Sequence, residues 1–531
     1  MKPATRWLPL AVAALAVAVS VGRFDNDWVF DDDDVIRDGA LIHDPARLLD
    51  AWTSHTLVAS RYDPGLQPVD TYRPMPLTSF TLDAMISGRD PWAFHVTAAL
   101  LHVGCALLVF AIGAFWLKSR WAAFYGAAVF AAHPWGVEAH VWLNGRSDPL
   151  ALLFGLAALR ALLEAERRRD RWRWRAGAAA CLTLGLFSKE TLLLVLPALA
   201  LMPGPPERDE PWTTRSRGRL LPLVLPAAIY LTARTWVLGG ARAHRDADML
   251  LDAAWNLPWL LLDGLRQAAA PATPHLRSLR DDYAGLEAVH ITLACVALLV
   301  IATLAWRARR RFPVAAWSTL WFFAPLVPVA IISTVLWPGF GRYLYIPLAG
   351  LAWALAELGG ELRARPAIRA ALGALHVLLL AALAWSFTNS FQDTERLYAD
   401  AIAANPESAM AHGFLGITRY EERDLEAAIP PLARAVALDP DEHRYRIHLA
   451  RALNATGRQE DATALARESI ALFRGRREEA PYHLVVVNAL REPDRELALR
   501  HLDRCLEVWP GRPDCQRARR FLLEGEAPAP R

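Results

Sequence analysis

The sequence predicts an all-helical protein with a polytopic membrane domain and a C-terminal, water-exposed α-solenoid. Three observations indicate this fold class. Of the 531 residues, 54% are hydrophobic, and the mean hydropathy is positive at +0.17. Long apolar runs recur up to about residue 390, whereas charge is concentrated between the runs and in the remaining tail. In that tail, Pro406 and Pro440 lie 34 residues apart, which is the period of tetratricopeptide repeats (TPRs).

The membrane domain is predicted to cover residues 1–390 and to contain about eleven spans. Several runs are shorter than the ~20 residues that cross a bilayer. The first run follows Lys2 and Arg6 and ends without a clear cleavage site, so we interpret it as an uncleaved signal anchor. The predicted spans are 7–21, 93–117, 121–137, 148–163, 176–188, 190–203, 219–238, 288–306, 313–335, 343–359 and 367–388.

Arginine-rich connections predict the orientation of these spans. The positive-inside rule assigns such connections, together with the N-terminus, to the cytoplasm. The spans alternate consistently only if residues 239–287 make no single crossing, so the apolar run 253–270 is interpreted as an interfacial or re-entrant helix. The tail and the large first outer loop, 23–92, then lie on the outer face. The arginine clusters lie at 167–175, 208–219, 307–311 and 363–369.

Residues 391–525 are predicted to form about three TPRs. Small residues recur at the spacings that allow paired helices to approach closely, among them Gly416, Ala428 and Ala435. A generic array of helical hairpins is the alternative interpretation. Cys505 and Cys515 can form a disulfide if the tail lies in an oxidising compartment.

The predicted outer loops contain most of the unusual polar residues of the membrane half. Six aspartates fall within residues 25–34 and would raise some of their own pKa values by mutual repulsion. Such a stretch can provide a general base, metal ligands or a solvated helix start. Polar groups close to hydrocarbon are costly and therefore tend to be functional. The other candidates are Tyr72, Arg73, His133, Glu138, Arg146, Asp148, Lys189, Glu190, Arg342 and Tyr343.

Acids in the first outer loop and cations in later ones predict a site for an anionic, lipid-borne substrate. The cations would bind a phosphate or pyrophosphate leaving group, and an aspartate would deprotonate an acceptor. His133 and His140 are seven residues apart, which is not a metalloprotease spacing, and no metal site is predicted there. A divalent metal is permitted by the aspartates but not required, so the cofactor stays unknown. A formal net charge of +3 gives no indication of nucleic-acid binding.

Five motifs in order, followed by the repeat tail, resemble the transmembrane-and-TPR O-mannosyltransferase family. They are WVFDD (Trp28 to Asp32), YRP (Tyr72 to Pro74), HP-x3-E-x3-W-x3-R-x-D (His133 to Asp148), SKE (Ser188 to Glu190) and RYLYIP (Arg342 to Pro347). The resemblance covers nearly the whole chain. It implies a GT-C glycosyltransferase fold and transfer of a sugar from a polyprenyl-phosphate donor to a protein hydroxyl on the exoplasmic side.

The resemblance also implies roles for single residues. Asp31 or Asp32 would be the general base, and the other motif residues would bind the donor or support groups that do. The family usually reads ERYLY where this chain has Gly341, which puts the role of that carboxylate, and the identity of the sugar, in question. The Ala- and Arg-rich composition and short tail suggest a bacterial inner-membrane protein with a periplasmic tail.

Two other functions fit parts of the sequence. A non-enzymatic envelope scaffold would use its TPRs to recruit partners, and its outer-loop motifs would then tolerate alanine. A transporter would place its ionisable groups near the bilayer midplane, whereas here they lie at the ends of the predicted spans. The resemblance favours the glycosyltransferase, acting at the lipid bilayer on a protein acceptor.

Overall fold

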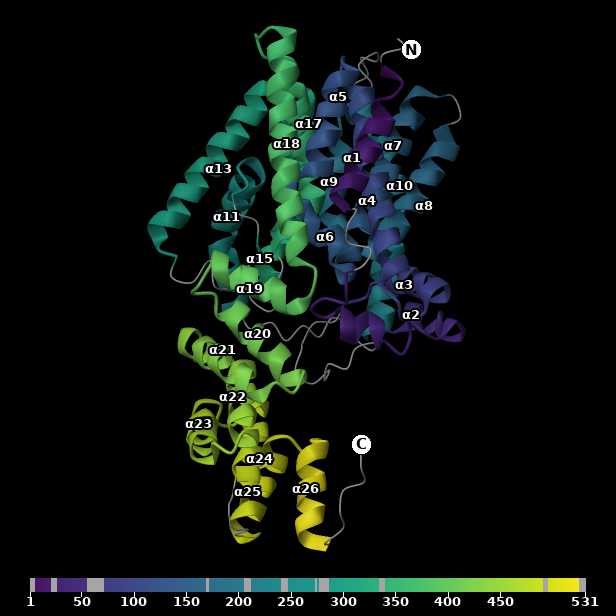
Figure 1. Cartoon of the computed structure of the whole chain (residues 1–531). Coiled ribbons are helices and arrows are strands. Elements are labelled where there is room, and N and C mark those ends of the chain that lie inside the picture. Colours follow the sequence, from purple (N-terminus) through teal and green to yellow (C-terminus); the bar gives the residue numbers. More distant parts are fainter. Residues whose placement is uncertain are drawn as a thin grey trace. The chain divides into compact units, whose positions relative to one another are not determined.

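The computed structural model describes residues 5–20, 26–54, 71–168, 171–204, 212–239, 247–272, 275–276, 286–333, 340–489 and 495–524. Several predictions fall outside these residues: Asp25 of the acidic stretch, residues 55–70 of the first outer loop, and the segment before Phe340. The chain divides into two compact units, Met1–Asp393 and Thr394–Arg531 (Figure 1). Every regular element within the described residues is a helix, which confirms the all-helical prediction.

Helices of the first unit occupy the positions of the eleven predicted spans. Among the described residues, five segments are long and apolar enough to cross a membrane: Trp92–Trp116, Gly218–Leu238, Ala288–Ala308, Pro313–Ala330 and Pro366–Ser390. The helices at the predicted spans are α1 (Leu8–Ser20), α4 (Trp92–Trp116), α5 (Arg120–Ala132), α7 (Ser147–Arg167), α8 (Arg171–Ser188), η7 (Glu190–Val195) with α9 (Leu196–Leu201), α10 (Trp212–Leu238), α13 (Ala288–Ala308), α14 (Pro313–Phe323) with η8 (Ala324–Leu326) and α15 (Val327–Ser333), α17 (Tyr345–Gly360) and α18 (Pro366–Ser390).

Apolar side chains face outward along these helices. On α13, Leu293, Val300 and Leu304 are each at least half exposed, although the helix carries almost no charge before its last turn. A water-soluble protein buries such a surface, whereas hydrocarbon accepts it. The first unit is therefore an integral membrane domain. The region predicted to be interfacial or re-entrant forms α11 (Ala247–Ala269), which packs against α13 and α15.

The two ends of the helical bundle differ in character. The 25-residue helix α4 begins where the Phe94 carbonyl accepts a hydrogen bond from Arg146, and ends where the Trp116 indole donates one to the Pro203 carbonyl. Near that second end Arg219 pairs with Glu166. The first end gathers short helices: η2 (Asp33–Arg37), η3 (Pro45–Arg47), α2 (Asp50–Thr53), α3 (Pro74–Ser87), η5 (Pro134–Gly136), α6 (Val137–Val141), η6 (Leu143–Arg146) and α16 (Phe340–Tyr343).

The start of the first outer loop lies against the end of the last long helix. The Asn26 side-chain amide donates to the Phe391 carbonyl at 2.6 Å, and the Asp27 amide donates to the Gln392 carbonyl at 3.4 Å. Both contacts join segments some 365 residues apart, directly after α1 and directly after α18. The chain therefore leaves α18 at the same end of the bundle that carries the acidic stretch.

The second unit is a succession of short helices in which neighbours along the chain pack together (Figure 1). Its three hairpins are α20–α21, α22–α23 and α24–α25, preceded by one helix and followed by another. The helices are α19 (Thr394–Ala404), α20 (Ala409–Glu421), α21 (Leu425–Leu438), α22 (His443–Ala455), α23 (Gln459–Leu472), η9 (Arg477–Glu479), α24 (Ala480–Ala489), α25 (Arg495–Val508) and α26 (Pro513–Glu524).

Small residues hold these hairpins together. A Cβ built on Gly416 would lie 2.5 Å from Leu432 within the first hairpin, and one on Gly413 would lie 2.0 Å from Tyr445 of the next. No side chain fits at either position without moving its neighbour. Cys505 and Cys515 are joined by a disulfide, the pairing that the sequence left open, so that α25 and α26 are covalently linked.

Candidate active site

The acidic stretch folds into the tight turn that leads to η2. Phe30 has a φ of +62°, a conformation that is uncommon for a bulky residue and is found where the surroundings enforce it. The turn directs two consecutive carboxylates toward Asn144 of η6. The Asn144 side-chain amide donates to Asp31 Oδ2 at 2.8 Å, and its backbone N–H donates to Asp32 Oδ1, also at 2.8 Å.

The two aspartates have different surroundings. Asp32 is buried, and its second oxygen, Oδ2, accepts the Val29 backbone N–H at 3.3 Å. Both of its oxygens are therefore used to hold the backbone. Asp31 is only partly buried, and its Oδ1 atom makes no hydrogen bond of normal geometry among the described residues, although the Trp142 side chain interacts with this carboxylate and lowers its pKa. Asp31 is therefore held less completely by the protein than Asp32 is.

Burial raises the pKa of both carboxyl groups. The pKa of Asp31 rises to about 6, because burial outweighs the opposing effects of the Arg342 charge and the Asn144 hydrogen bond. The pKa of Asp32 rises well above its usual value, through burial and then through the neighbouring Asp31 charge. At neutral pH Asp31 is therefore mainly ionised but still basic enough to accept a proton.

Arg342 is the cation that acts on Asp31. Its guanidinium lies over the Trp142 ring at 4.6 Å and the Tyr343 ring at 5.1 Å. Among the described residues it makes no ion pair, although its charge also acts on Glu138 and Asp148. A guanidinium held by aromatic rings and without a carboxylate partner can bind a phosphate bidentately, through two N–H donors.

Glu138 lies beneath Gly341. A Cβ built on Gly341 would be 2.7 Å from Glu138 Oε2, so this carboxylate occupies the space that a side chain at position 341 would need. Glu138 is fully buried, and the backbone N–H groups of Gly341 and Arg342 act on its carboxylate. Burial raises its pKa to about 7, against the lowering effect of Arg342.

Two further predicted cations are held in ion pairs in the same region. Lys189 Nζ contacts both oxygens of Asp148, at 2.6 and 2.7 Å, and both side chains are buried. Lys189 also lies over the Tyr343 ring at 4.8 Å. Arg73 donates two hydrogen bonds to Glu190, at 2.9 and 2.5 Å. The structure therefore brings Asp31, Asp32, Arg73, Glu138, Asp148, Lys189, Glu190, Arg342 and Tyr343 together.

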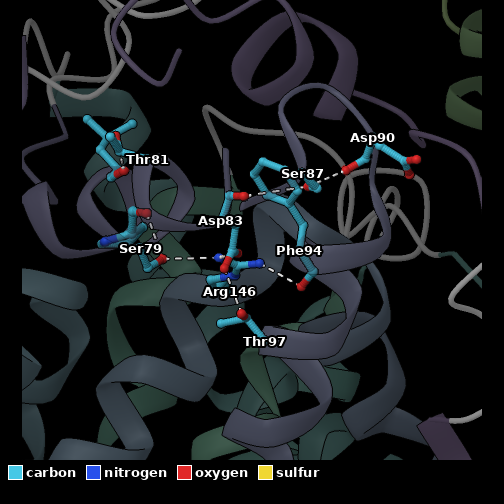
Figure 2. Close-up of polar contacts among 10 residues, drawn as sticks. Ser79, Thr81, Asp83, Ser87, Asp90, Phe94, Thr97 and Arg146 are labelled. Carbon is cyan, nitrogen blue, oxygen red and sulfur yellow. Dashed lines mark hydrogen bonds and ion pairs between the residues drawn. The ribbon is translucent and has the colours of Figure 1, made fainter. Parts of the chain in front are cut away.

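Arg146 has a separate position beside this cluster (Figure 2). Its guanidinium is fully buried, pairs with Asp83 of α3, donates to the Phe94 carbonyl at 2.7 Å and lies 4.5 Å from the Phe80 ring. Thr97 donates to the other Asp83 oxygen at 2.6 Å. This arrangement joins α3, α4 and η6, and it leaves Arg146 facing protein rather than an open site.

Tyr72 and His133 also make structural contacts. The Tyr72 hydroxyl donates to the Trp52 carbonyl at 2.7 Å, and its ring packs against Tyr230. His133 Nε2 donates to the Ala268 carbonyl at 2.9 Å, and its Nδ1 accepts the Trp135 backbone N–H at 3.3 Å. Both His133 nitrogens are thereby used, and the ring is not part of the charged cluster.

Two residues that organise the region were not among the candidates predicted from the sequence. Asn144 positions both aspartates, and Asp83 neutralises Arg146. Asn144 stands within a motif already singled out, so its amide was a visible candidate. Asp83 is a lone carboxylate among apolar residues of α3, which is the pattern expected of a buried ion-pair partner. No group of three or more His, Cys, Asp or Glu that could hold a metal ion occurs among the described residues.

Comparisons with known proteins connect this region to one enzyme family. Residues 72–236 match the family described as dolichyl-phosphate-mannose-protein mannosyltransferase. The matched segment contains the ion pairs of Arg73 and Lys189 and the α6–η6 turn, but neither Asp31 nor Arg342.

Individual relatives give the same result over stretches of 91 to 178 residues. The chain is 29% identical to the human protein O-mannosyl-transferase TMTC4 over 178 residues, which is 31% of this chain and 24% of that protein. It is 36% identical to the Drosophila melanogaster protein O-mannosyl-transferase Tmtc2 over 137 residues, 25% of this chain and 15% of the relative. It is 40% identical to mouse TMTC1 over 91 residues, 17% and 10% of the two chains. The chain thus spans less than a quarter of the length of each of these relatives.

Proposed function

Because the chain belongs to the transmembrane-and-TPR O-mannosyltransferase family, we propose that it is a membrane glycosyltransferase of the GT-C type. It moves a sugar, mannose by analogy with these relatives, from a polyprenyl-phosphate donor to a hydroxyl group of a protein. The observation that carries the proposal is that the charge of Arg342, which makes no ion pair among the described residues, acts on the partly buried carboxylate of Asp31.

Asp31 is the general base of the proposed reaction. Its Oδ1 atom accepts the proton of the acceptor hydroxyl as that oxygen attacks the anomeric carbon of the sugar. The bond from that carbon to the phosphate oxygen breaks, and the phosphate leaves with the electron pair. Asp32 positions Asp31, because its own two oxygens hold the backbone of Asn144 and Val29.

Arg342 binds the donor phosphate and stabilises the charge that develops on it. Glu190 neutralises Arg73, and Asp148 neutralises Lys189. These two cations therefore attract the donor phosphate less strongly than Arg342 does, and they support its site from nearby. Glu138 faces the sugar, since its carboxylate lies beside Arg342 and sugar hydroxyls can donate hydrogen bonds to it. Gly341 leaves room for this carboxylate, because a Cβ at that position would lie 2.7 Å from Glu138 Oε2.

The proposed site lies on the outer face, with about eleven spans and a periplasmic or otherwise exoplasmic tail of three TPRs, 391–525, that docks the protein acceptor or another partner. Two observations support this arrangement. The contacts of Asn26 and Asp27 with Phe391 and Gln392 bring the acidic stretch and the exit of α18 to the same end of the bundle. The Cys505–Cys515 disulfide suits an oxidising compartment.

The test is transfer of label from a polyprenyl-phosphate sugar to protein by the purified full chain. We expect label from polyprenyl-phosphate mannose to enter protein, and Asp31→Asn to reduce the rate by roughly 10²–10⁴ while donor binding persists. Asp50→Asn is the matched control: this aspartate lies in the same loop but is exposed and pairs with Arg47. Equal rates for Asp31→Asn and wild type would refute the assignment of the base.

A further inference from the structure

Arginines and tryptophans alternate at the start of α8, far from the candidate active site. The first five residues of this helix, 171–175, read RWRWR, and we call them the arginine–tryptophan segment. Helix α8 ends at Ser188, directly before Lys189 of the site. Its 18 residues, at ~1.5 Å each, span about 27 Å, which is close to the ~30 Å hydrocarbon core of a bilayer. The segment therefore lies at the opposite end of the membrane unit from the site.

This end of the bundle carries more positive charge than its acidic residues neutralise. Residues 160–175 contain seven arginines against three acidic residues. The three arginines of the segment make no ion pair with any residue that the structure describes. Asp170, which lies outside the described residues, can offset one of these three charges at most. Arginines outside the segment engage the other two acids: Glu164 pairs with Arg160 and Arg168, and Glu166 pairs with Arg219.

The position of the three arginines on the helix adds to their repulsion. The free N–H groups at a helix N-terminus carry partial positive charge, which favours anions and disfavours cations. Arg171, Arg173 and Arg175 all fall within the first turn and a half of α8. They therefore repel the helix terminus as well as one another, and an anion bound beside this turn would relieve both repulsions.

The tryptophans of the segment indicate where such an anion would lie. The Trp172 side chain is 68% exposed, and the Arg173 guanidinium lies 5.5 Å from the centre of its ring. The Arg168 guanidinium lies 5.0 Å from the Trp174 ring. A guanidinium placed over a ring keeps N–H donors that can bind an anion. An exposed tryptophan is typical of the headgroup layer of a bilayer, where its ring meets both apolar and polar groups.

The segment also borders the lipid-facing surface of the neighbouring helix α10. A Cβ built on Gly218 would overlap the Arg175 guanidinium, so this charge lies against α10 at that level. Gly218 is also where the apolar span of α10 begins. Beyond it, the Leu221 and Val224 side chains are 73% and 60% exposed. A layer of cations thus adjoins an exposed hydrocarbon surface, and a phospholipid complements both, whereas a soluble anion complements only the cations.

We propose that the arginine–tryptophan segment binds the headgroup of an anionic phospholipid whose acyl chains lie along α10. The lipid phosphate accepts hydrogen bonds from Arg173 and Arg175, and the Trp172 ring lies among the headgroups. The acyl chains contact Leu221 and Val224. Clusters of arginines at a membrane surface attract anionic lipids in this way. This lipid site is separate from the donor site, so its occupation does not depend on sugar transfer.

The experiment measures lipid binding to the purified full chain in micelles of a neutral detergent. The probes are phosphatidylglycerol and phosphatidylcholine with the same dansyl group on one acyl chain, and energy transfer from tryptophan reports binding. We expect phosphatidylglycerol to bind at least about 10-fold more tightly, and added salt to weaken its binding. Its affinity should fall about 10-fold or more in the triple variant Arg171→Gln/Arg173→Gln/Arg175→Gln, while that of phosphatidylcholine stays unchanged.

The matched control removes three charges from another arginine-rich connection, between α17 and α18. The variant Arg363→Gln/Arg365→Gln/Arg369→Gln loses the same charge, but no tryptophan adjoins these arginines in the sequence. It should bind phosphatidylglycerol as wild type does. Equal losses of affinity in the two triple variants would overturn the inference, because surface charge in general would then attract the lipid. Equal affinity of the wild type for both lipids would overturn it as well.

A lysine variant tests the same site without a change of charge. Arginines also influence membrane orientation, and lysines preserve that effect, so Arg171→Lys/Arg173→Lys/Arg175→Lys should melt like wild type. It should bind phosphatidylglycerol about 2- to 5-fold more weakly, because an ammonium group cannot bind a phosphate bidentately. Affinity equal to that of wild type would contradict the proposed contacts.

Inorganic phosphate distinguishes a lipid from a soluble anion. It should displace the labelled phosphatidylglycerol no more than sodium chloride of equal ionic strength does. Stronger displacement by phosphate would show that the segment binds soluble anions, and the assignment to a phospholipid would be wrong.

Discussion

Replacing Asp31 by Asn should remove sugar transfer and at the same time make the protein more stable. The carboxyl group has a pKa of about 6 in the folded chain, against an ordinary value of 3.8. A carboxyl group whose pKa is raised by folding destabilises the folded state wherever it is ionised. Asparagine has nearly the same shape and can still accept the Asn144 hydrogen bond, but it carries no charge.

The size of the gain follows from the pKa shift. A shift from 3.8 to about 6 corresponds to about 3 kcal/mol, at 1.36 kcal/mol for each pKa unit. This value is an upper bound, because Asp31 is only partly buried and solvent screens part of its charge. We therefore expect the variant to gain about 1–2 kcal/mol at pH 7.5.

The pH dependence of this gain distinguishes it from a general packing effect. Above pH 6 the wild-type carboxylate is ionised in the folded state, so the full difference in the free energy of unfolding between the variant and wild type is present. As the pH falls from 6 toward 3.8 the folded group takes up its proton, and the difference should disappear near pH 4. Tryptophan fluorescence reports the melt, because the chain contains 21 tryptophans.

The control for this measurement is again Asp50→Asn, whose exposed ion pair should change stability by less than about 0.5 kcal/mol. If Asp31→Asn melted at or below the wild-type temperature at pH 7.5, Arg342 would be stabilising the carboxylate by more than burial destabilises it. The assignment of Asp31 as a base with a raised pKa would then be wrong.

Two further substitutions test the cations of the region. Arg342→Gln should weaken binding of polyprenyl phosphate about 10- to 100-fold in a competition assay. Because Arg342 lowers the pKa of Asp31, the substitution should also shift the acidic limb of the pH–rate profile for sugar transfer above pH 6. Unchanged affinity would show that the phosphate binds elsewhere. Asp83→Asn should destabilise the membrane unit by about 3–5 kcal/mol, because it leaves the Arg146 charge buried without its partner; an unchanged melting temperature would show that this ion pair is not structural.

The sequence by itself determined the helical class of the fold and which side chains are candidates for the site. Apolar runs of sufficient length must be helical in a bilayer, since every backbone group has to be satisfied within the segment. Because polar groups are costly near hydrocarbon, polar side chains at the ends of the apolar runs indicated candidate functional residues. Asp31, Glu138, Lys189 and Arg342 were all recognisable because charged groups in such positions are costly.

Only the tertiary structure decided which of these groups work together. Asp31 and Asp32 are adjacent in sequence and chemically equal, and they differ because the backbone N–H groups of Val29 and Asn144 hold both oxygens of Asp32, whereas side chains act on Asp31. Arg342 acts on Asp31 across more than 300 residues of chain.

The dependence on tertiary packing also explains why some predicted residues lie outside the charged cluster. Arg146 and His133 resemble binding groups in sequence, but Asp83 and the Ala268 carbonyl engage them. Partners of this kind are set by how helices pack, and helix packing depends on contacts between segments distant along the chain. The pattern of residues therefore identifies which groups are available for chemistry, and the packing determines which of them remain free for a substrate.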